Sequence, residues 1–431
     1  MSNPVLLYLV TSILTILLSV FLIKHYKLSK YQVMIFVLLI VFWSSVNLIR
    51  AYRKSYALNP VELGGLNLGL YAASNIAAAY GLISIFMRFL VFLGSDWFKS
   101  RKLMIFIGLV LISGTSYWAY LNPNYETLLI SSYALGIGAS LLSLFNVLFA
   151  ETFSPKQAMM SVSILSVAPL LAEFIMSPVQ YHFTKNTVAD YGSMWLISAL
   201  LAAVSIVLLL FVTDNKTSKG TMRFSIFKEI LANKSTWFFG GLGIIVSLIR
   251  VALSGSNIIT YVQNDFVRMS PFAIAYIDFI YSIAQLVAGV LAGLYFARRF
   301  TTKWTLVLGL FLSLVFNVLL LFTYNPTLIF WSYTFSGFGY GLTYNSLIGL
   351  TLENVDVNRR EMNMAIFQTF FAIGIFFGDK VYALFVSILP ASTSVQQYYY
   401  QVFLWMAIVT AVLMIVTALF VQRKDERIEK A

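Results

Sequence analysis

Long hydrophobic runs, separated by short polar segments, occupy most of the chain. A helix needs about 20 mainly apolar residues to cross a lipid bilayer. Thirteen runs reach that length, with approximate limits at 4–24, 33–57, 66–94, 103–121, 126–151, 157–181, 192–213, 236–262, 271–297, 304–323, 327–352, 361–388 and 397–421. The pattern therefore predicts an all-α protein that spans the membrane many times.

Basic residues gather in every second loop between these runs. The segments 99–102 and 216–234 are rich in Lys and Arg, whereas the alternate loops hold only Arg53, Lys54, Lys185 and Arg268. By the positive-inside rule, the basic loops face the cytoplasm. We therefore predict a multi-pass protein of the cell membrane, with its N-terminus outside and its C-terminus in the cytoplasm.

The longest polar interruption, at 213–235, leaves six runs on each side once the first run is set aside. The predicted parts are an extra N-terminal transmembrane helix with a basic loop (1–31), a six-helix bundle (32–213), a cytoplasmic linker (214–235), a second six-helix bundle (236–421) and a cytoplasmic tail (422–431). No small-residue cleavage pattern follows the first run, so we expect it to be retained as a membrane helix. Residues 226–231 of the linker are expected to form a short amphipathic helix.

The two halves resemble each other when the chain is shifted by about 201 positions. This shift places Lys102 on Lys303, Gly108 on Gly309, Gly136 on Gly337 and Gly138 on Gly339. Repeated halves are typical of secondary transporters, which bind their substrate near the bilayer midplane.

An arginine lies deep in the first run of each half. Arg50 and Arg250 both end the tripeptide Leu-Ile-Arg. An arginine keeps its charge at any accessible pH, so membrane depth is costly unless water, a carboxylate or an anionic ligand meets it. Asn47 and Lys54 share one helix face with Arg50, and Asn257 shares the corresponding stripe with Arg250. The pattern predicts a polar site to which both halves contribute.

Composition narrows the class of function. The chain is 60% hydrophobic and only 11% charged, which excludes an ordinary soluble domain. The net charge of +12 does not indicate nucleic-acid binding, because the basic residues lie in loops between hydrophobic runs. The sequence contains no cysteine and no recognisable motif for metal binding, for a catalytic nucleophile or for a phosphate-binding loop. We expect no enzymatic activity, no cofactor and no bound metal.

The loop Gly94-Ser-Asp-Trp-Phe-Lys-Ser-Arg-Lys102 resembles the loop signature of the major facilitator superfamily. A second, weaker copy runs from Gly293 to Lys303. The resemblance covers residues 33–421 and implies the major facilitator fold, two six-helix bundles with pseudo-two-fold symmetry. It also implies that charged residues at helix ends brace one conformation, namely Asp96, Arg101, Glu151, Arg299 and Glu353. The alternative is that these charges only solvate the helix ends.

Within that superfamily the chain looks most like the organophosphate:phosphate antiporters. The similar features are an arginine on the first helix of each half, Tyr80-Gly81 on the next helix, and a cation, Arg88, after it. The resemblance implies exchange of a phosphorylated organic anion, such as a sugar phosphate or glycerol phosphate, for inorganic phosphate by alternating access. The implied partners are that anion, inorganic phosphate and membrane lipid, in a monomer that binds no nucleic acid. The expected substrate-binding residues are Arg50, Arg250, Arg88, Lys54, Asn47, Asn257 and Tyr80.

Other interpretations of the same residues stay open. The two arginines can instead pair with membrane-depth acids, for which Glu173, Asp278 and Asp379 are the candidates. A buried carboxylate can also take up a proton, so these three acids are candidates for proton coupling. The alternatives are therefore a proton-coupled carrier of carboxylates, sugars, drugs or lipids, and a transporter-like membrane receptor.

The predicted topology places the two termini on opposite sides of the membrane. Because the chain contains no cysteine, single cysteines introduced near Ser2 and near Ala431 can be labelled with an impermeant thiol reagent in intact cells. We expect labelling at Ser2→Cys only. Labelling of both positions from the same side would contradict the odd number of spans.

Overall fold

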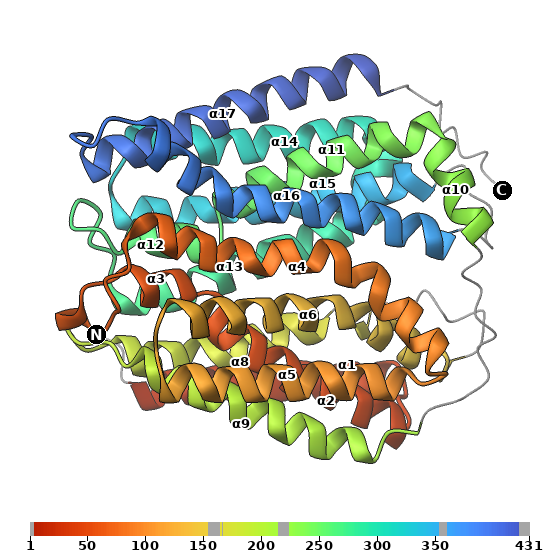
Figure 1. Cartoon of the computed structure of the whole chain (residues 1–431). Helices are drawn as coiled ribbons and strands as arrows, with labels where there is room; N and C mark the ends of the chain where they lie inside the picture. The colour runs from red at the N-terminus through yellow and green to blue at the C-terminus, as the bar shows by residue number, and fades with distance from the viewer. Residues whose placement is uncertain (1–3, 154–163, 166, 214–223, 353–359, 422–431) are drawn as a thin grey trace. The chain divides into compact units, whose positions relative to one another are not determined.

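The computed structural model describes residues 4–153, 164–165, 167–213, 224–352 and 360–421 (Figure 1). In these residues the regular structure is helical, which confirms the predicted all-α fold. The chain divides into two compact units. The first unit comprises residues 1–221 and 271–279, and the second unit comprises residues 222–270 and 280–431.

The first unit begins with a helix that precedes the core. Its helices are α1 (Pro4–His25), α2 (Lys30–Arg50), α3 (Arg53–Leu58), η1 (Val61–Leu63), α4 (Gly69–Trp97), α5 (Arg101–Leu121), α6 (Tyr125–Ala150), α8 (Val167–Thr184) and α9 (Tyr191–Leu210). The first nine residues of α13, 271–279, also belong to this unit.

The second unit begins with the short helix α10 (Phe224–Ala232), where a linker helix is expected. The helices that follow are α11 (Lys234–Ala252), α12 (Ser256–Val262), α13 (Pro271–Leu291), η3 (Ala292–Phe296), α14 (Ala297–Phe322), α15 (Pro326–Leu352), α16 (Arg360–Ile388) and α17 (Val395–Phe420).

Ten helical segments in the described residues are long and apolar enough to cross a membrane. The three other predicted spans coincide with α1, α8 and α15. In α1 the apolar stretch Leu9–His25 belongs to the described part, and α8 is described only from Val167. At 27 residues α15 is long enough, but Ser, Thr, Tyr and Asn side chains lower its hydropathy.

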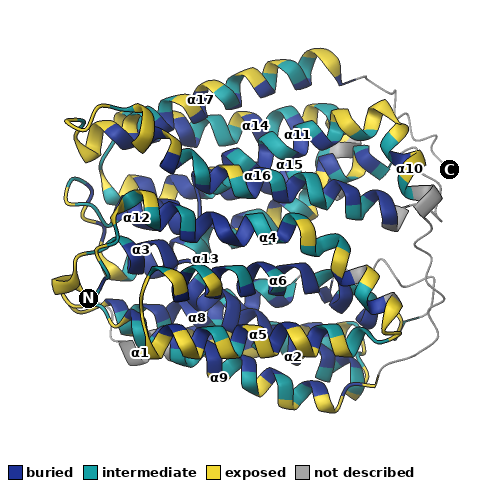
Figure 2. Ribbon diagram, in the orientation of Figure 1, coloured by how far each residue is buried: buried dark blue, intermediate teal, exposed yellow. Residues whose placement is uncertain are grey.

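In the first unit, the helix that carries Arg50 is the central one. In the most apolar stretch of Lys30–Leu58, which comprises α2 and α3, 78% of the residues are buried, whereas the share is 33% in the corresponding stretch of α5 (Figure 2). Helix α2 packs on α8 and α9, α4 packs on α6, and α1 packs on α8. A central helix contacts neighbours on most of its surface, so its polar side chains face protein or a cavity and not lipid.

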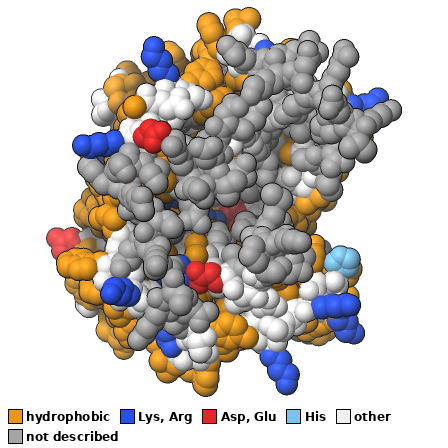
Figure 3. Space-filling model, turned by 90° about the vertical axis from the view of Figure 1, so that its right-hand side faces the viewer, with side chains coloured by type: hydrophobic (Ala, Val, Ile, Leu, Met, Phe, Trp, Pro, Cys, Tyr) orange, Lys and Arg blue, Asp and Glu red, His pale blue; other side chains and the backbone are white. Residues whose placement is uncertain are grey.

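Hydrogen bonds of Lys102 and Tyr31 connect three helices at one end of the first unit. The Lys102 ammonium donates to the carbonyls of Leu210 (3.0 Å) and Val212 (2.8 Å), at the end of α9. The Tyr31 hydroxyl donates to the Thr213 carbonyl. The starts of α2 and α5 therefore lie beside the end of α9. Figure 3 faces this end, where Lys and Arg side chains project among hydrophobic ones.

The two units repeat the same close helix contacts. A Cβ added to Gly136 would lie 2.4 Å from the Tyr80 carbonyl oxygen, and one added to Gly337 would lie 2.3 Å from the Tyr281 carbonyl oxygen. Both pairs obey the shift of 201 positions, so α6 meets α4 in the first unit as α15 meets α13 in the second. Only glycine permits this approach of two backbones.

Each arginine-bearing helix is interrupted just after its arginine. Helix α2 ends at Arg50 and α3 begins at Arg53, while α11 ends at Ala252 and α12 begins at Ser256. Gly255, with φ of +55°, forms part of the second interruption. Both arginines therefore lie at the C-terminal end of a helix, where backbone carbonyls lose their helical partners.

Candidate functional site

Arg53 provides the donors that the end of α2 requires. Its Nη1 donates to the Arg50 carbonyl at 2.7 Å and its Nη2 to the Ala77 carbonyl of α4 at 3.0 Å. Its guanidinium lies 5.2 Å from the centre of the Tyr80 ring. Arg53 is 4% exposed and Lys54 is fully buried, and both lie on α3. Counting them as outer-loop cations is therefore wrong, whereas the predicted hydrophobic run 33–57 includes both. Unpaired carbonyls in an apolar interior are costly, which accounts for a buried cation at this place.

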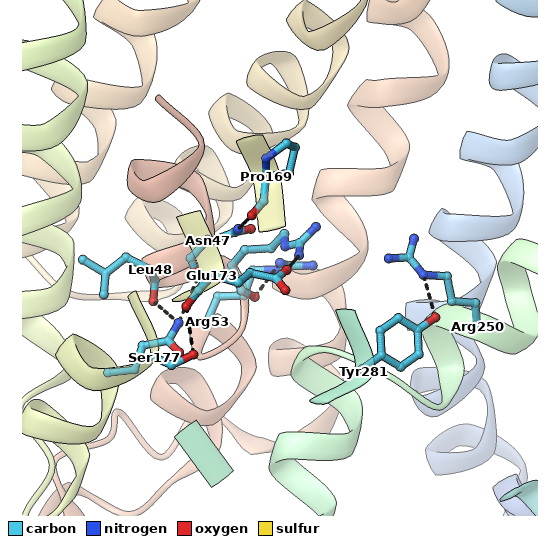
Figure 4. A network of polar contacts seen from close by, with 10 residues as sticks. Asn47, Leu48, Arg53, Pro169, Glu173, Ser177, Arg250 and Tyr281 are labelled. Atoms are coloured by element: carbon cyan, nitrogen blue, oxygen red, sulfur yellow. Dashed lines mark hydrogen bonds and ion pairs between the residues drawn. The ribbon is translucent and has the colours of Figure 1, made fainter. Parts of the chain in front are cut away.

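Arg50 forms an ion pair with Glu173 of α8 in the first unit. The distance from Nη2 to Oε1 is 3.6 Å, and the two side chains are 25% and 15% exposed. The Asn47 amide donates to the Pro169 carbonyl at 3.4 Å, and the Gln180 amide donates to the Asn47 carbonyl at 3.1 Å. Figure 4 shows Asn47, Pro169 and Glu173 close together. Helix α8 thus holds the end of α2 and supplies a carboxylate to its arginine.

In the second unit, neutral side chains donate to the backbone carbonyls at the interruption between α11 and α12, and a buried acid lies beside them. The Asn257 amide nitrogen donates to the Val251 carbonyl and to the Asp379 carboxylate, each at 2.8 Å. The Tyr382 hydroxyl donates to the Ala252 carbonyl at 2.6 Å. Asn257 is fully buried and Asp379 is 1% exposed. These contacts give Asn257 and Asp379 a structural task at the interruption.

Arg250 faces a pocket within the second unit. Its Nε donates to the Tyr281 hydroxyl at 3.3 Å (Figure 4), and its guanidinium carbon lies 4.3 Å from the centre of the Tyr340 ring. The Arg250 pocket is lined by Val246, Ile249, Arg250, Leu253, Tyr281, Leu310, Ser313, Asn317, Ser336, Tyr340 and Thr343. The space between these side chains is about 340 Å³ when the open solvent at its mouth is included.

The two arginines have different surroundings despite the internal repeat. A shift of 201 positions places Gly374 of α16 where α8 has Glu173. A Cβ on Gly374 would lie 1.9 Å from Ser247 Oγ, so α11 and α16 touch there and leave no room for a side chain. Two tyrosine rings lie near the Arg250 guanidinium, those of Tyr281 and Tyr340, and aromatic rings attract a cation.

The remaining predicted residues are spread over both units. Arg101 and Glu151 form an ion pair of 2.6 Å at the end of the first unit described above. Arg88 on α4 and Asp278 on α13 are partly buried, and Arg299 is exposed. Asp96 lies on α4, but its side chain is outside the described part, and Glu353 lies outside the described residues. The described part of the chain holds no cluster of three or more His, Asp or Glu that could bind a metal.

Sequence reasoning missed the residues that complete the Arg250 pocket. Ser313 and Asn317 are four positions apart on α14, and Ser336, Tyr340 and Thr343 recur at helical spacing on α15. Such stripes are a usable signal, because polar positions at that spacing share one helix face. Tyr281 could have been found from the repeat, since it corresponds to Tyr80.

Comparison with known proteins agrees with this architecture. Residues 240–431 match the sequence profile of the Major Facilitator Superfamily. The chain is similar to a POT family transporter solved in complex with 5-aminolevulinic acid, with a TM-score of 0.73 and 13% identity over 90% of this chain and 96% of that chain. It is also similar to the peptide transporter POT in complex with sulfate (TM-score 0.70, 15% identity, 90% and 94% covered). For the nucleoside transporter NupG, the TM-score is 0.70 and the identity 14%, over 92% and 100% of the two chains.

None of the curated proteins compared matches the chain. The structural similarities show that the chain has the major facilitator fold, as predicted, and helix α1 precedes its two bundles along the chain. The profile match covers residues 240–431 of the chain, and the structural similarities establish the fold. They do not single out the organophosphate:phosphate antiporters.

The contacts of Arg53 predict a large structural effect for its replacement. Arg53→Met keeps an apolar stem but removes both donations to backbone carbonyls, and we expect a loss of about 3 kcal/mol of stability. Arg268→Met is the matched control, because the Arg268 side chain is 78% exposed. Thermal unfolding in detergent measures both variants, and equal unfolding temperatures would contradict the capping role of Arg53.

Proposed function

We propose that the chain is a secondary transporter of a small organic anion and that Arg250 binds the anionic group. One observation carries this proposal: the Arg250 guanidinium lines a pocket together with hydroxyl, amide and tyrosine side chains. A guanidinium binds carboxylate or phosphate groups through paired hydrogen bonds. Two of the similar structures contain a small compound with an acidic group, 5-aminolevulinic acid in one and sulfate in the other, which is consistent with the proposal.

The transport mode that we propose is exchange of a phosphorylated organic anion for inorganic phosphate by alternating access. The planar fork of an arginine suits the charged oxygens of a phosphate better than a lysine ammonium does. In alternating access, the protein changes the side of the membrane to which its site opens. A site that keeps its positive charge makes this change readily only when a bound anion neutralises it. Transport in one direction then requires a counter-anion in the other.

The Arg50–Glu173 ion pair favours a second candidate, proton-coupled transport of a carboxylate, a sugar, a drug or a lipid. Membrane-depth carboxylates often relay protons in transporters. Glu173 can bind either a proton or the Arg50 guanidinium, so protonation would open the 3.6 Å pair. In the exchange mode, by contrast, Glu173 keeps its charge throughout the cycle and compensates that of Arg50.

Uptake of labelled glycerol 3-phosphate into phosphate-loaded vesicles tests the proposed exchange. We expect uptake that depends on internal phosphate and survives a protonophore. Arg250→Lys should reduce uptake at least about tenfold, equal to about 1.4 kcal/mol, because an ammonium keeps the charge but lacks the fork. Arg268→Lys, at an exposed position, is the matched control and should retain full uptake.

Two results would contradict this proposal in different ways. Normal uptake by the Arg250→Lys variant would remove Arg250 from anion binding. Uptake into phosphate-free vesicles that collapses with the pH gradient, and that Glu173→Gln abolishes, would replace exchange by proton coupling through Glu173.

A further inference from the structure

Among the polar side chains of the Arg250 pocket, the guanidinium only donates, three side chains present acceptors, and Tyr281, Ser336 and Tyr340 carry hydroxyls that can do either. Arg250 is the only charged residue among the described residues that line the pocket, and its guanidinium offers hydrogen-bond donors only. Helices α14 and α15 contribute Ser313, Asn317 and Thr343 to the same lining. The hydrogen bonds of these three residues determine what they offer to a ligand.

The orientation of the Asn317 amide is fixed by α17. The Thr410 hydroxyl donates to the Met406 carbonyl at 2.7 Å, so its oxygen is left as an acceptor. The Asn317 amide nitrogen donates to that oxygen at 2.8 Å. Asn317 is 1% exposed, and its carboxamide oxygen has no partner among the described residues. This oxygen therefore remains an acceptor at the pocket.

Ser313 and Thr343 use their hydroxyl hydrogens within their own helices. The Ser313 hydroxyl donates to the Gly309 carbonyl at 3.1 Å, and the Thr343 hydroxyl donates to the Tyr340 carbonyl at 3.0 Å. Such bonds to the preceding turn are common for serine and threonine in helices. Each hydroxyl oxygen then presents lone pairs to the pocket.

We infer that the substrate carries a hydrogen-bond donor, a hydroxyl or an ammonium group, beside its anionic group. The inference rests on the proposed function, since it assigns the anionic group to Arg250. The donor of the substrate faces the acceptors Ser313, Asn317 and Thr343. An anion whose second end offers only acceptors, or only methyl groups, leaves these oxygens unpaired and binds less tightly.

Matched ligand pairs test this inference on the full chain in lipid nanodiscs. Glycerol 3-phosphate and propyl phosphate differ in hydroxyl groups, whereas 2-aminoethyl phosphate and ethyl phosphate differ in an ammonium group. Calorimetric titration should give at least about tenfold tighter binding for the donor-bearing member of one pair, about 1.4 kcal/mol. The pair that shows the preference identifies whether the donor is a hydroxyl or an ammonium group.

Two variants connect the preference to the acceptors. Thr343→Val and Asn317→Leu each remove an oxygen from the pocket, and each should reduce the affinity ratio of the preferred pair severalfold. Thr334→Val is the matched control, because Thr334 also lies on α15 and donates to the preceding turn, at the Trp331 carbonyl, but does not line the pocket. It should keep the ratio of the unmodified protein.

The possible failures are distinguishable. Equal affinity for both members of both pairs would overturn the inference and leave anion binding intact, and so would an unchanged ratio in Thr343→Val. If no phosphate ester binds at all, the proposed function itself fails. Should Asn317→Leu not fold, the ligand pairs and Thr343→Val still decide the question.

Discussion

Interruption of a helix inside the membrane is the constraint on which the two candidate sites depend. Where α2 and α11 stop, their last carbonyls lack helical partners, and the bilayer interior offers no water to replace them. The first unit satisfies these carbonyls with the buried guanidinium of Arg53, and the second with Asn257 and Tyr382. Each solution fixes the helix end, and with it the arginine placed there.

The internal repeat gives the two units the same helix contacts, but the surroundings of Arg50 and Arg250 differ. Arg50 has a carboxylate within ion-pair distance, whereas Arg250 has tyrosine rings and a polar pocket. One difference lies at the position of the acid, because Gly374 stands where the first unit has Glu173 and is required for contact between α11 and α16. This difference in surroundings is why the proposed function assigns the anionic ligand to Arg250.

The sequence alone predicts the helices, the internal repeat and the two arginines, since hydrophobic runs and membrane-depth charges are visible in it. It does not predict the interruptions: a cation such as Arg53, near the end of a hydrophobic run, resembles a loop residue until its partners are known. It also leaves open which acid reaches Arg50, because this depends on how α8 is rotated. The pocket residues of α15 carry no charge, so the sequence does not mark them as it marks the two arginines.

A crystal structure of the protein grown with selenate tests the central claim most directly, because the anomalous signal of selenium locates the anion without reference to any assumed substrate. The account predicts a peak within hydrogen-bonding distance of the Arg250 guanidinium, with Arg50 still paired to Glu173. A peak at Arg50 and none at Arg250 would contradict it.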